Sequence, residues 1–275
     1  MATDDLIKTA KDSVSLVSEI IRAAGDNPNV KAAANNLGQS AVTLTRTINN
    51  ALLPLAAINF AFDKARVYFN GKFQQDLSDK TSKIPSTAMV EPKASIAGPT
   101  LQGLAFTHEE PGLKDMYLNL LATAMDGRIA NTAHPAFVEI IKQLDAEDAD
   151  LIRGALSSPG AIPIIQLRIT TVGEPGYQVV ATHLLNLRDG TEQQMLIENP
   201  QLPAMIDNWS RLGLIDVDYN QQLTGAASYE WVELRPELVR LRQERETDTV
   251  KVTHQKGILI RTQLGLRFAS AVGLL

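Results

Sequence analysis

The chain has 275 residues, of which 44% are hydrophobic and 21% are charged, so it can bury a core in one or two domains. Its formal net charge of -5 does not favour non-specific binding to nucleic acid or to anionic lipid. Because there is no cysteine, disulfides, thiolate catalysis and cysteine-ligated zinc are excluded. The N-terminus has early acidic residues and no apolar run, so it is not a secretory signal and we expect a cytoplasmic protein.

Residues 1–77 are expected to form a helical N-terminal section. Apolar residues first recur at three- and four-residue spacing, which is typical of one helix face, until Gly25 ends the pattern. A longer helical pattern follows over about 40–77, in which Pro54 should kink or split the helix. The apolar window Ala51–Phe62 is shorter than the roughly 20 residues that span a bilayer. We therefore expect a buried helix there, with an interfacial role as the alternative.

Residues 78–100 change in character, because they are rich in Ser, Thr, Lys and Pro. Each proline biases its predecessor toward extended backbone, so this stretch predicts a linker or an extended arm and a domain boundary. The C-terminal domain is then expected to cover 101–275. Its first half predicts three helices, which begin near Glu110, at Pro135 and after Asp145.

The second half of this domain predicts a minor β part. Ile162–Thr171 is β-branched and partly alternating, which indicates a strand, whereas 178–187 is ambiguous between strand and helix. A helix over Pro203–Leu212, a strand-like Gly257–Arg261 and a final helix over Thr262–Val272 follow. The predicted fold class is therefore mainly α with a minor α+β character, with an N-terminal helical section and a C-terminal helical domain.

The last third of the chain looks like a winged-helix unit. The pair Leu212-Gly213 would leave the penultimate helix, and Thr262 would cap the last helix after a hairpin. DNA-reading winged helices usually carry a basic recognition helix, but here Arg211 shares its helix with Asp207. Arg235, Arg240 and Arg242 alternate with glutamates, which is typical of a solvated helical face. We interpret the unit as a protein-interaction or structural module, with a winged-helix DNA-binding regulator as the alternative.

No motif for catalysis, cofactor binding or metal binding is present. The histidines are not spaced as metal pairs, and the sequence lacks a P-loop, a GxGxxG fingerprint and a GxSxG elbow. The acids over 145–150 are explained by the first turn of a helix. We therefore expect no cofactor, no metal and no enzyme. An enzyme with an unfamiliar site would need a pocket that gathers Arg128, His134 and Glu139.

Two blocks in the middle of the chain, Leu113–Asp126 (LKDMYLNLLATAMD) and His134–Leu144 (HPAFVEIIKQL), carry a family resemblance. Shorter matching stretches are Leu53–Leu55, Ile84–Pro85, Ile96–Pro99, Leu101–Leu104 and Leu264–Phe268. Together they resemble the abortive-infection alpha family over roughly residues 50–270. The resemblance implies bacterial antiphage defence, in which an infected cell stops growing or dies before phage is released. It brings no agreed catalytic residues.

The expected mode of action is protein interaction or membrane disturbance. The long N-terminal helices are too apolar to be stable alone, so we expect a homo-oligomer, with a phage or host protein as a further partner and with nucleic acid disfavoured. We hypothesise that the helix over Ala51–Phe73 is masked until triggering, when it could contact a membrane. The candidate interaction residues are Leu55, Ile58, Phe62, Arg211, Arg240 and Arg242.

Overall fold

The computed structural model describes the chain from Asn59 to Leu275. The expectations for the first helix, for Pro54 and for the candidate residues Leu55 and Ile58 lie outside the described residues. The described chain forms two compact units that divide after Asp150, and its residues 270–274 return to the first unit. This division differs from the sections expected from the sequence, because residues 78–100 lie within the first unit.

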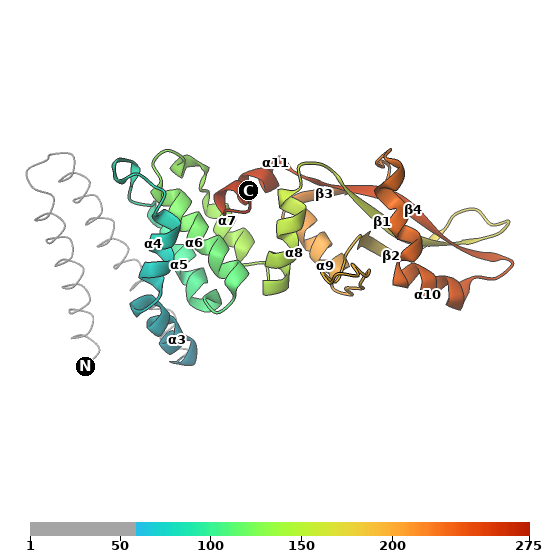
Figure 1. The fold of residues 1–275 in the computed structure, drawn as a ribbon, viewed down its shortest axis with the longest axis horizontal. Helices are drawn as coiled ribbons and strands as arrows, with labels where there is room; N and C mark the ends of the chain where they lie inside the picture. Colours follow the sequence, from blue (N-terminus) through green and yellow to red (C-terminus); the bar gives the residue numbers. More distant parts are fainter. Residues whose placement is uncertain (1–58) are drawn as a thin grey trace, which may run out of the picture. The chain divides into compact units, whose positions relative to one another are not determined.

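The first unit is helical and is built around one central helix (Figure 1). Its helices are α3 (Asn59–Asn70), α4 (Phe73–Thr81), α5 (Ala94–Thr107), α6 (Pro111–Met125), α7 (Pro135–Ile141) and the start of α8 (Ala146–Ser157), with 3-10 turns η2 (Ser86–Ala88) and η3 (Ala130–Thr132). Helix α6 contacts α4, α5 and α7, and most of its side chains are buried. Within the described chain, no helix is both long and apolar enough to cross a membrane.

The predicted helix over residues 40–77 is interrupted within its described part. Helix α3 ends at Asn70 and α4 begins at Phe73. The N–H of Gly71 donates to the carbonyl of Val67 at 3.1 Å, as expected where an Asn-Gly pair ends a helix. The expectation of a continuous helix at this point is therefore wrong. Phe69 and Phe73 are buried with their ring centroids 5.0 Å apart, which packs the two short helices together.

The expected arm over 78–100 contains more helix than its prolines indicate. Helix α5 begins at Ala94 and includes Pro99 in its interior. A proline there removes one backbone hydrogen bond. Burial of the neighbouring Leu101 and Leu104, both 0% exposed, offsets this loss.

Two helices of the first unit begin where they were predicted, and both starts are capped. His134 precedes α7, and its Nδ1 accepts the N–H of Ala136 at 3.1 Å. At α8, the Asp145 carboxylate accepts the N–H of Asp148 at 2.7 Å, and the Asp148 carboxylate accepts the N–H of Asp145 at 3.1 Å. This reciprocal pair is a capping box. It explains the acidic cluster without a metal.

The second unit contains a four-stranded antiparallel sheet of order β2-β1-β4-β3. Its elements after α8 are β1 (Ile162–Thr171), β2 (Gln178–Leu185), α9 (Leu202–Arg211), β3 (Ile215–Asp218), η4 (Ala226–Leu234), α10 (Pro236–Arg245), β4 (Val250–Arg261) and α11 (Gln263–Ala271). Strands β1 and β4 pair along the whole length of β1. The strand predicted over 162–171 is confirmed, the ambiguous segment is a strand, and the last strand begins earlier than predicted.

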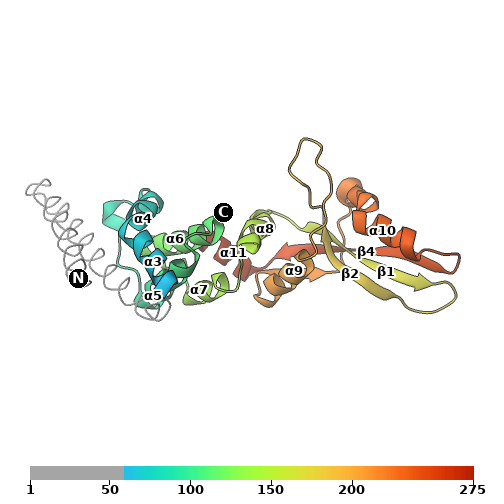
Figure 2. The ribbon, with the colours of Figure 1, turned by 90° about the horizontal axis from the view of Figure 1, so that it is seen from below.

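One face of this sheet forms the core of the second unit. Figure 2 shows α10 along one side of strands β1, β2 and β4. The strands and the helical segments η4 and α10 contribute the buried residues Ile165, Leu167, Leu184, Tyr229, Trp231, Val232, Leu238 and Val252. The coarse fold class, mainly α with a minor β part, is therefore confirmed.

The junction between α9 and α11 has the features predicted for a winged-helix-like unit. Gly213 follows α9 with φ of 72°, a conformation that favours glycine. The Thr262 hydroxyl donates to the Gly213 carbonyl at 2.5 Å and accepts the N–H of Gly265 at 2.9 Å. Between β3 and β4, however, the chain forms η4 and α10 rather than a short wing. The winged-helix assignment stays a prediction.

Gly265 provides a test of this junction. A Cβ atom at this position would lie 2.0 Å from the Leu214 carbonyl oxygen, so Gly265→Ala should destabilise the fold by about 1–3 kcal/mol. The matched control is Gly154→Ala in α8, where a Cβ meets nothing within 4 Å and alanine should stabilise by up to about 1 kcal/mol. Urea unfolding followed by circular dichroism measures both. Equal stability of the two variants would contradict the close approach.

Candidate functional site

The described candidate residues are not gathered into one site. Phe62 falls in α3 of the first unit, whereas Arg211, Arg240 and Arg242 belong to the second unit. The Arg211 guanidinium donates to the Asn208 side-chain oxygen, with Nη2 at 2.6 Å. This contact lies within the last turn of α9, so it orders the helix end.

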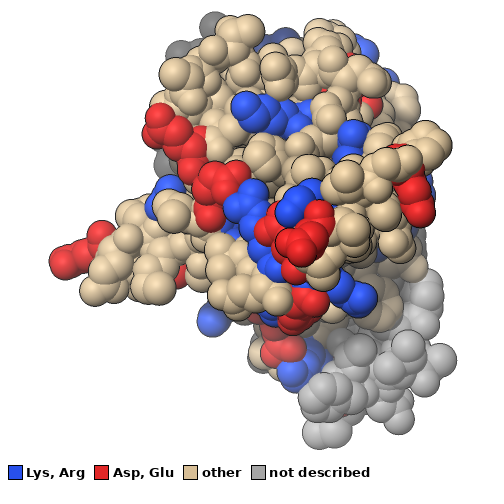
Figure 3. Space-filling model, turned by 90° about the vertical axis from the view of Figure 1, so that its right-hand side faces the viewer, with Lys and Arg blue, Asp and Glu red and all other residues tan. Residues whose placement is uncertain are grey.

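Arg240 and Arg242 lie on α10 and are each paired with a glutamate. Arg240 contacts both carboxylate oxygens of Glu198, at 2.5 and 3.0 Å, and Arg242 Nη1 lies 2.5 Å from Glu233 Oε2. These hydrogen bonds hold the pKa of Glu198 and Glu233 below the usual glutamate range. On the side drawn in Figure 3, basic and acidic side chains alternate rather than form a basic patch. This distribution does not favour a phosphate backbone.

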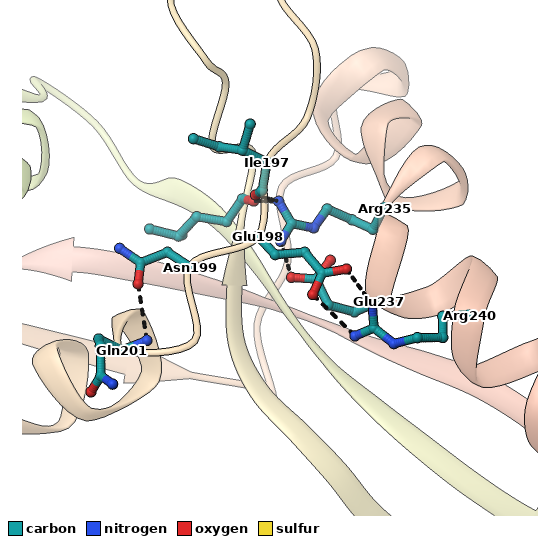
Figure 4. Close-up of polar contacts among 8 residues, drawn as sticks. Ile197, Glu198, Asn199, Gln201, Arg235, Glu237 and Arg240 are labelled. Atoms are coloured by element: carbon teal, nitrogen blue, oxygen red, sulfur yellow. Dashed lines mark hydrogen bonds and ion pairs between the residues drawn. The ribbon is translucent and has the colours of Figure 1, made fainter.

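Arg235 is the most buried arginine of this region, with 2% of its surface exposed (Figure 4). Its Nη1 donates to the carbonyls of Leu185 and Ile197, at 3.1 and 3.0 Å, and its Nη2 donates to Glu237. The prediction that Arg235 belongs to a solvated helical face is therefore wrong. The sequence pattern did not reveal that backbone carbonyls from the end of β2 and from the segment after it accept hydrogen bonds from this side chain.

A second polar cluster surrounds His183 in β2. The β1–β2 register shifts between Ile165 and Leu167, which indicates a β-bulge, and His183 has φ of 57°. Its Nε2 lies 3.0 Å from Asp207 Oδ1, and its Nδ1 lies 3.1 Å from the Tyr219 hydroxyl. The backbone N–H of His183 donates to the same hydroxyl at 3.0 Å. An uncommon backbone conformation is thus held by two side chains.

The electrostatics of this cluster favour a structural role. Burial raises the pKa of Tyr219 to about 12, so its phenol stays protonated. We assign the Tyr219 O–H as donor to His183 Nδ1, and the Nε2–H as donor to Asp207, because this arrangement gives both ring nitrogens a partner. Both ring nitrogens are then used within the chain. A general base needs a free lone pair facing its substrate.

Sequence reasoning missed this cluster for a physical reason. Asp207 is 24 residues from His183 and Tyr219 is 36 residues away, on α9 and beyond β3. No local spacing links the three residues. The only available signal was a histidine in a segment that is ambiguous between strand and helix.

The first unit has a surface pocket of about 530 Å³, beside α4 and α6. Three lysines and three aspartates line it, including Lys114 and Asp76, which pair at 3.1 Å. The residues of the enzyme alternative do not line it. Arg128 pairs with Asp126, and Glu139 pairs with Lys142. Among the residues the structure describes, no three His, Asp or Glu are placed to hold a metal ion.

Comparison with known protein families gives one clear result. The model of the abortive infection alpha family matches residues 65–272, so the chain belongs to this family and the predicted membership is confirmed. The match covers parts of both units. No curated protein and no solved structure matches the chain.

The two blocks that carried the resemblance are packing and capping elements. Most residues of the first block are buried in α6, and the second block begins with the cap His134 and buries Phe137 and Ile141. Asp126 closes the first block, and the hydrogen bonds from Arg128 hold its pKa below the usual range. The recognisable pattern therefore specifies the fold of the first unit rather than a reactive site.

Arg235→Met tests the buried network. The change leaves Glu237 without its cation and the carbonyls of Leu185 and Ile197 without their donor, so we expect a loss of about 3–5 kcal/mol in unfolding free energy. Arg240→Met, at a side chain 53% exposed, is the control and should have a much smaller effect. Chemical unfolding gives both values. Comparable losses would contradict the assignment of Arg235 as the anchor.

Tyr219→Phe gives a pH-dependent test of the His183 cluster. At about pH 8 the wild type should be more stable by about 1 kcal/mol, because phenylalanine cannot form the hydroxyl hydrogen bonds. An unfolded tyrosine ionises near pH 10, whereas the folded pKa is raised, so this stability is lost as pH rises through the folded value. The difference between wild type and variant should therefore shrink by about pH 11. An unchanged difference would contradict the assignment.

Proposed function

We propose that this member of the abortive infection alpha family protects bacteria against phage without catalysis, by contact with another protein. The observation that carries the proposal is the family match over residues 65–272. The family implies a response in which the infected cell stops growing or dies before phage is released. A cytoplasmic chain that senses infection or binds a cellular target fits this response.

The polar contacts of the second unit support interaction over catalysis. Arg235, Arg240 and Arg242 each pair with a glutamate, and His183 uses both ring nitrogens within the chain. Catalytic groups are usually left facing a cleft with a free acid, base or nucleophile. Side chains that bind one another instead stabilise the surface that surrounds them.

The charge distribution weighs against the DNA-binding alternative. The only basic residue of α9 is Arg211, and Asp207 lies on the same helix. Affinity for DNA rises with the number of phosphates that the protein neutralises. We therefore propose a protein partner, with self-association as an additional contact and with membrane disturbance as the alternative mode of action.

The direct test is phage plating on bacteria that express the chain from a native-strength promoter. Protection at low multiplicity of infection, with collapse of the culture at high multiplicity, is the expected result. Absence of protection against a broad phage panel would contradict the proposed function. Gel-shift binding to DNA that weakens steeply with salt would favour the regulator instead.

The contribution of the N-terminal section is tested by Leu55→Asp and Ile58→Asp. If the apolar helix predicted there makes the functional contact, either charge should abolish protection at unchanged protein abundance. Ser95→Asp, at an exposed position of α5, is the control and should protect like the wild type. Folded Leu55→Asp and Ile58→Asp proteins that still protect would exclude this role.

A further inference from the structure

The sheet of the second unit has a face that α10 does not cover. Successive residues of a strand point to opposite faces. Ile165, Leu167 and Ile169 pack into the core beneath η4 and α10, so Gln166 and Arg168 lie on the other face. Figure 2 shows α10 on one side of this part of the sheet and no described helix along the other side.

Neighbouring strands extend this surface. Arg168 is paired across the sheet with Val179 of β2 and Thr253 of β4, and Gln166 is paired with Gln255. Val179 is 40% exposed, and Tyr177, just before β2, is 56% exposed. We call this surface the open face; its residues are Arg168, Tyr177, Val179, Thr253 and Gln255, with the buried Gln166 beside Arg168.

Arg168 is held in a fixed position at the centre of the open face. Its guanidinium carbon lies 3.8 Å from the centroid of the Tyr177 ring, a cation–π contact. Its Nη1 donates to the Gln255 side-chain oxygen at 3.1 Å. With the Gln166 amide assigned with its oxygen toward Arg168, that oxygen accepts from Nη2 at 2.6 Å and from Nε at 3.0 Å. The guanidinium is therefore ordered before any partner binds.

The charge of Arg168 is not neutralised within the described chain. All three of its side-chain contacts are with neutral groups, and no described carboxylate forms an ion pair with it. The strands β1, β2 and β4 contain no Asp or Glu. Lys251, exposed on β4 and paired across the sheet with Thr170, adds a second cation. This contrasts with Arg240 and Arg242, which each face a glutamate.

We propose that the open face binds an acidic segment of a partner protein. A carboxylate of the segment pairs with Arg168, and apolar side chains of the segment pack on Tyr177 and Val179. Arginine and tyrosine are the residue types that most often dominate binding energy at protein interfaces. Because Arg168 is already ordered, binding costs little side-chain entropy. This inference deepens the proposed function, on which it rests for the role of the partner in defence.

Two other occupants fit the surface less well. Tight binding of a nucleic acid requires several cations that neutralise its phosphates. On the open face and beside it, strands β1 and β4 offer Arg168 and Lys251, next to exposed apolar groups. A second copy of the chain in a symmetric contact would place the same uncompensated arginines opposite each other, which is repulsive. An acidic segment complements both the charge and the apolar area.

The test uses the full chain and a fluorescein-labelled peptide of alternating Glu and Val residues, with a Lys–Val peptide as the control probe. We expect saturable fluorescence anisotropy for the Glu–Val peptide that weakens with salt, and no binding of the Lys–Val peptide. Arg168→Gln should raise the Kd by about tenfold or more, and Tyr177→Ala should also weaken binding. Arg267→Gln removes an exposed arginine of α11 and should leave the Kd unchanged.

Absence of saturable Glu–Val binding, or equal affinity of wild type and Arg168→Gln, overturns the proposal. Arg168-dependent binding of an oligothymidylate in place of the peptide also overturns it and assigns the face to nucleic acid. Circular dichroism of each variant shows whether the fold is retained. The peptide measurement is independent of phage, so peptide binding without phage protection refutes only the proposed function. Protection with Arg168-independent peptide binding refutes only this inference.

Discussion

The antiparallel pairing of β1 with β4 is the constraint on which the second unit depends. It joins segments about 90 residues apart along the whole length of β1, from Ile162 opposite Leu259 to Thr171 opposite Val250. The register decides which residues reach the core under α10 and which lie on the open face. A slip of one residue would exchange the two sets, so the apolar residues of β1 and β4 fix the pairing.

Strand β4 leads the chain back toward the residues of the first unit. After β4, helix α11 ends in residues that belong to the first unit. There, the side chains of Asn119 and Thr123 on α6 donate to the carbonyls of Val272 and Ala271, at 3.0 and 2.9 Å. These contacts satisfy carbonyl groups at a helix end that have no partner within the helix. The central helix that carries the family pattern thus also binds the C-terminal residues.

The two blocks that carry the resemblance and the proposed binding surface lie in different parts of the chain. The block over Leu113–Asp126 packs in the core of the first unit, where changes alter stability. The groups that could face a partner, Arg168 and Tyr177, lie in the second unit outside both blocks.

Local signals in the sequence predicted much of the fold. The helix starts at Pro135 and after Asp145 depend on contacts between residues close in sequence, and the end of α9 depends on the conformation of Gly213. Strand β1 is indicated by its own β-branched residues, so these elements could be predicted. Tertiary contacts decided the rest. Burial keeps helix α5 intact through a proline, backbone carbonyls from a distant segment surround an arginine, and the His183 cluster combines three elements.

The most direct measurement is a scan of single substitutions at every position, read out twice, as phage protection and as protein abundance in the cell. We expect that substitutions in the two blocks, Leu113–Asp126 and His134–Leu144, lose both together, whereas loss of protection at normal abundance is concentrated at Arg168, Tyr177 and their neighbours on the open face. Loss of protection at normal abundance that is concentrated instead at His183, Asp207 and Tyr219 would contradict the proposed binding role of the open face. That result would indicate a catalytic role for the cluster.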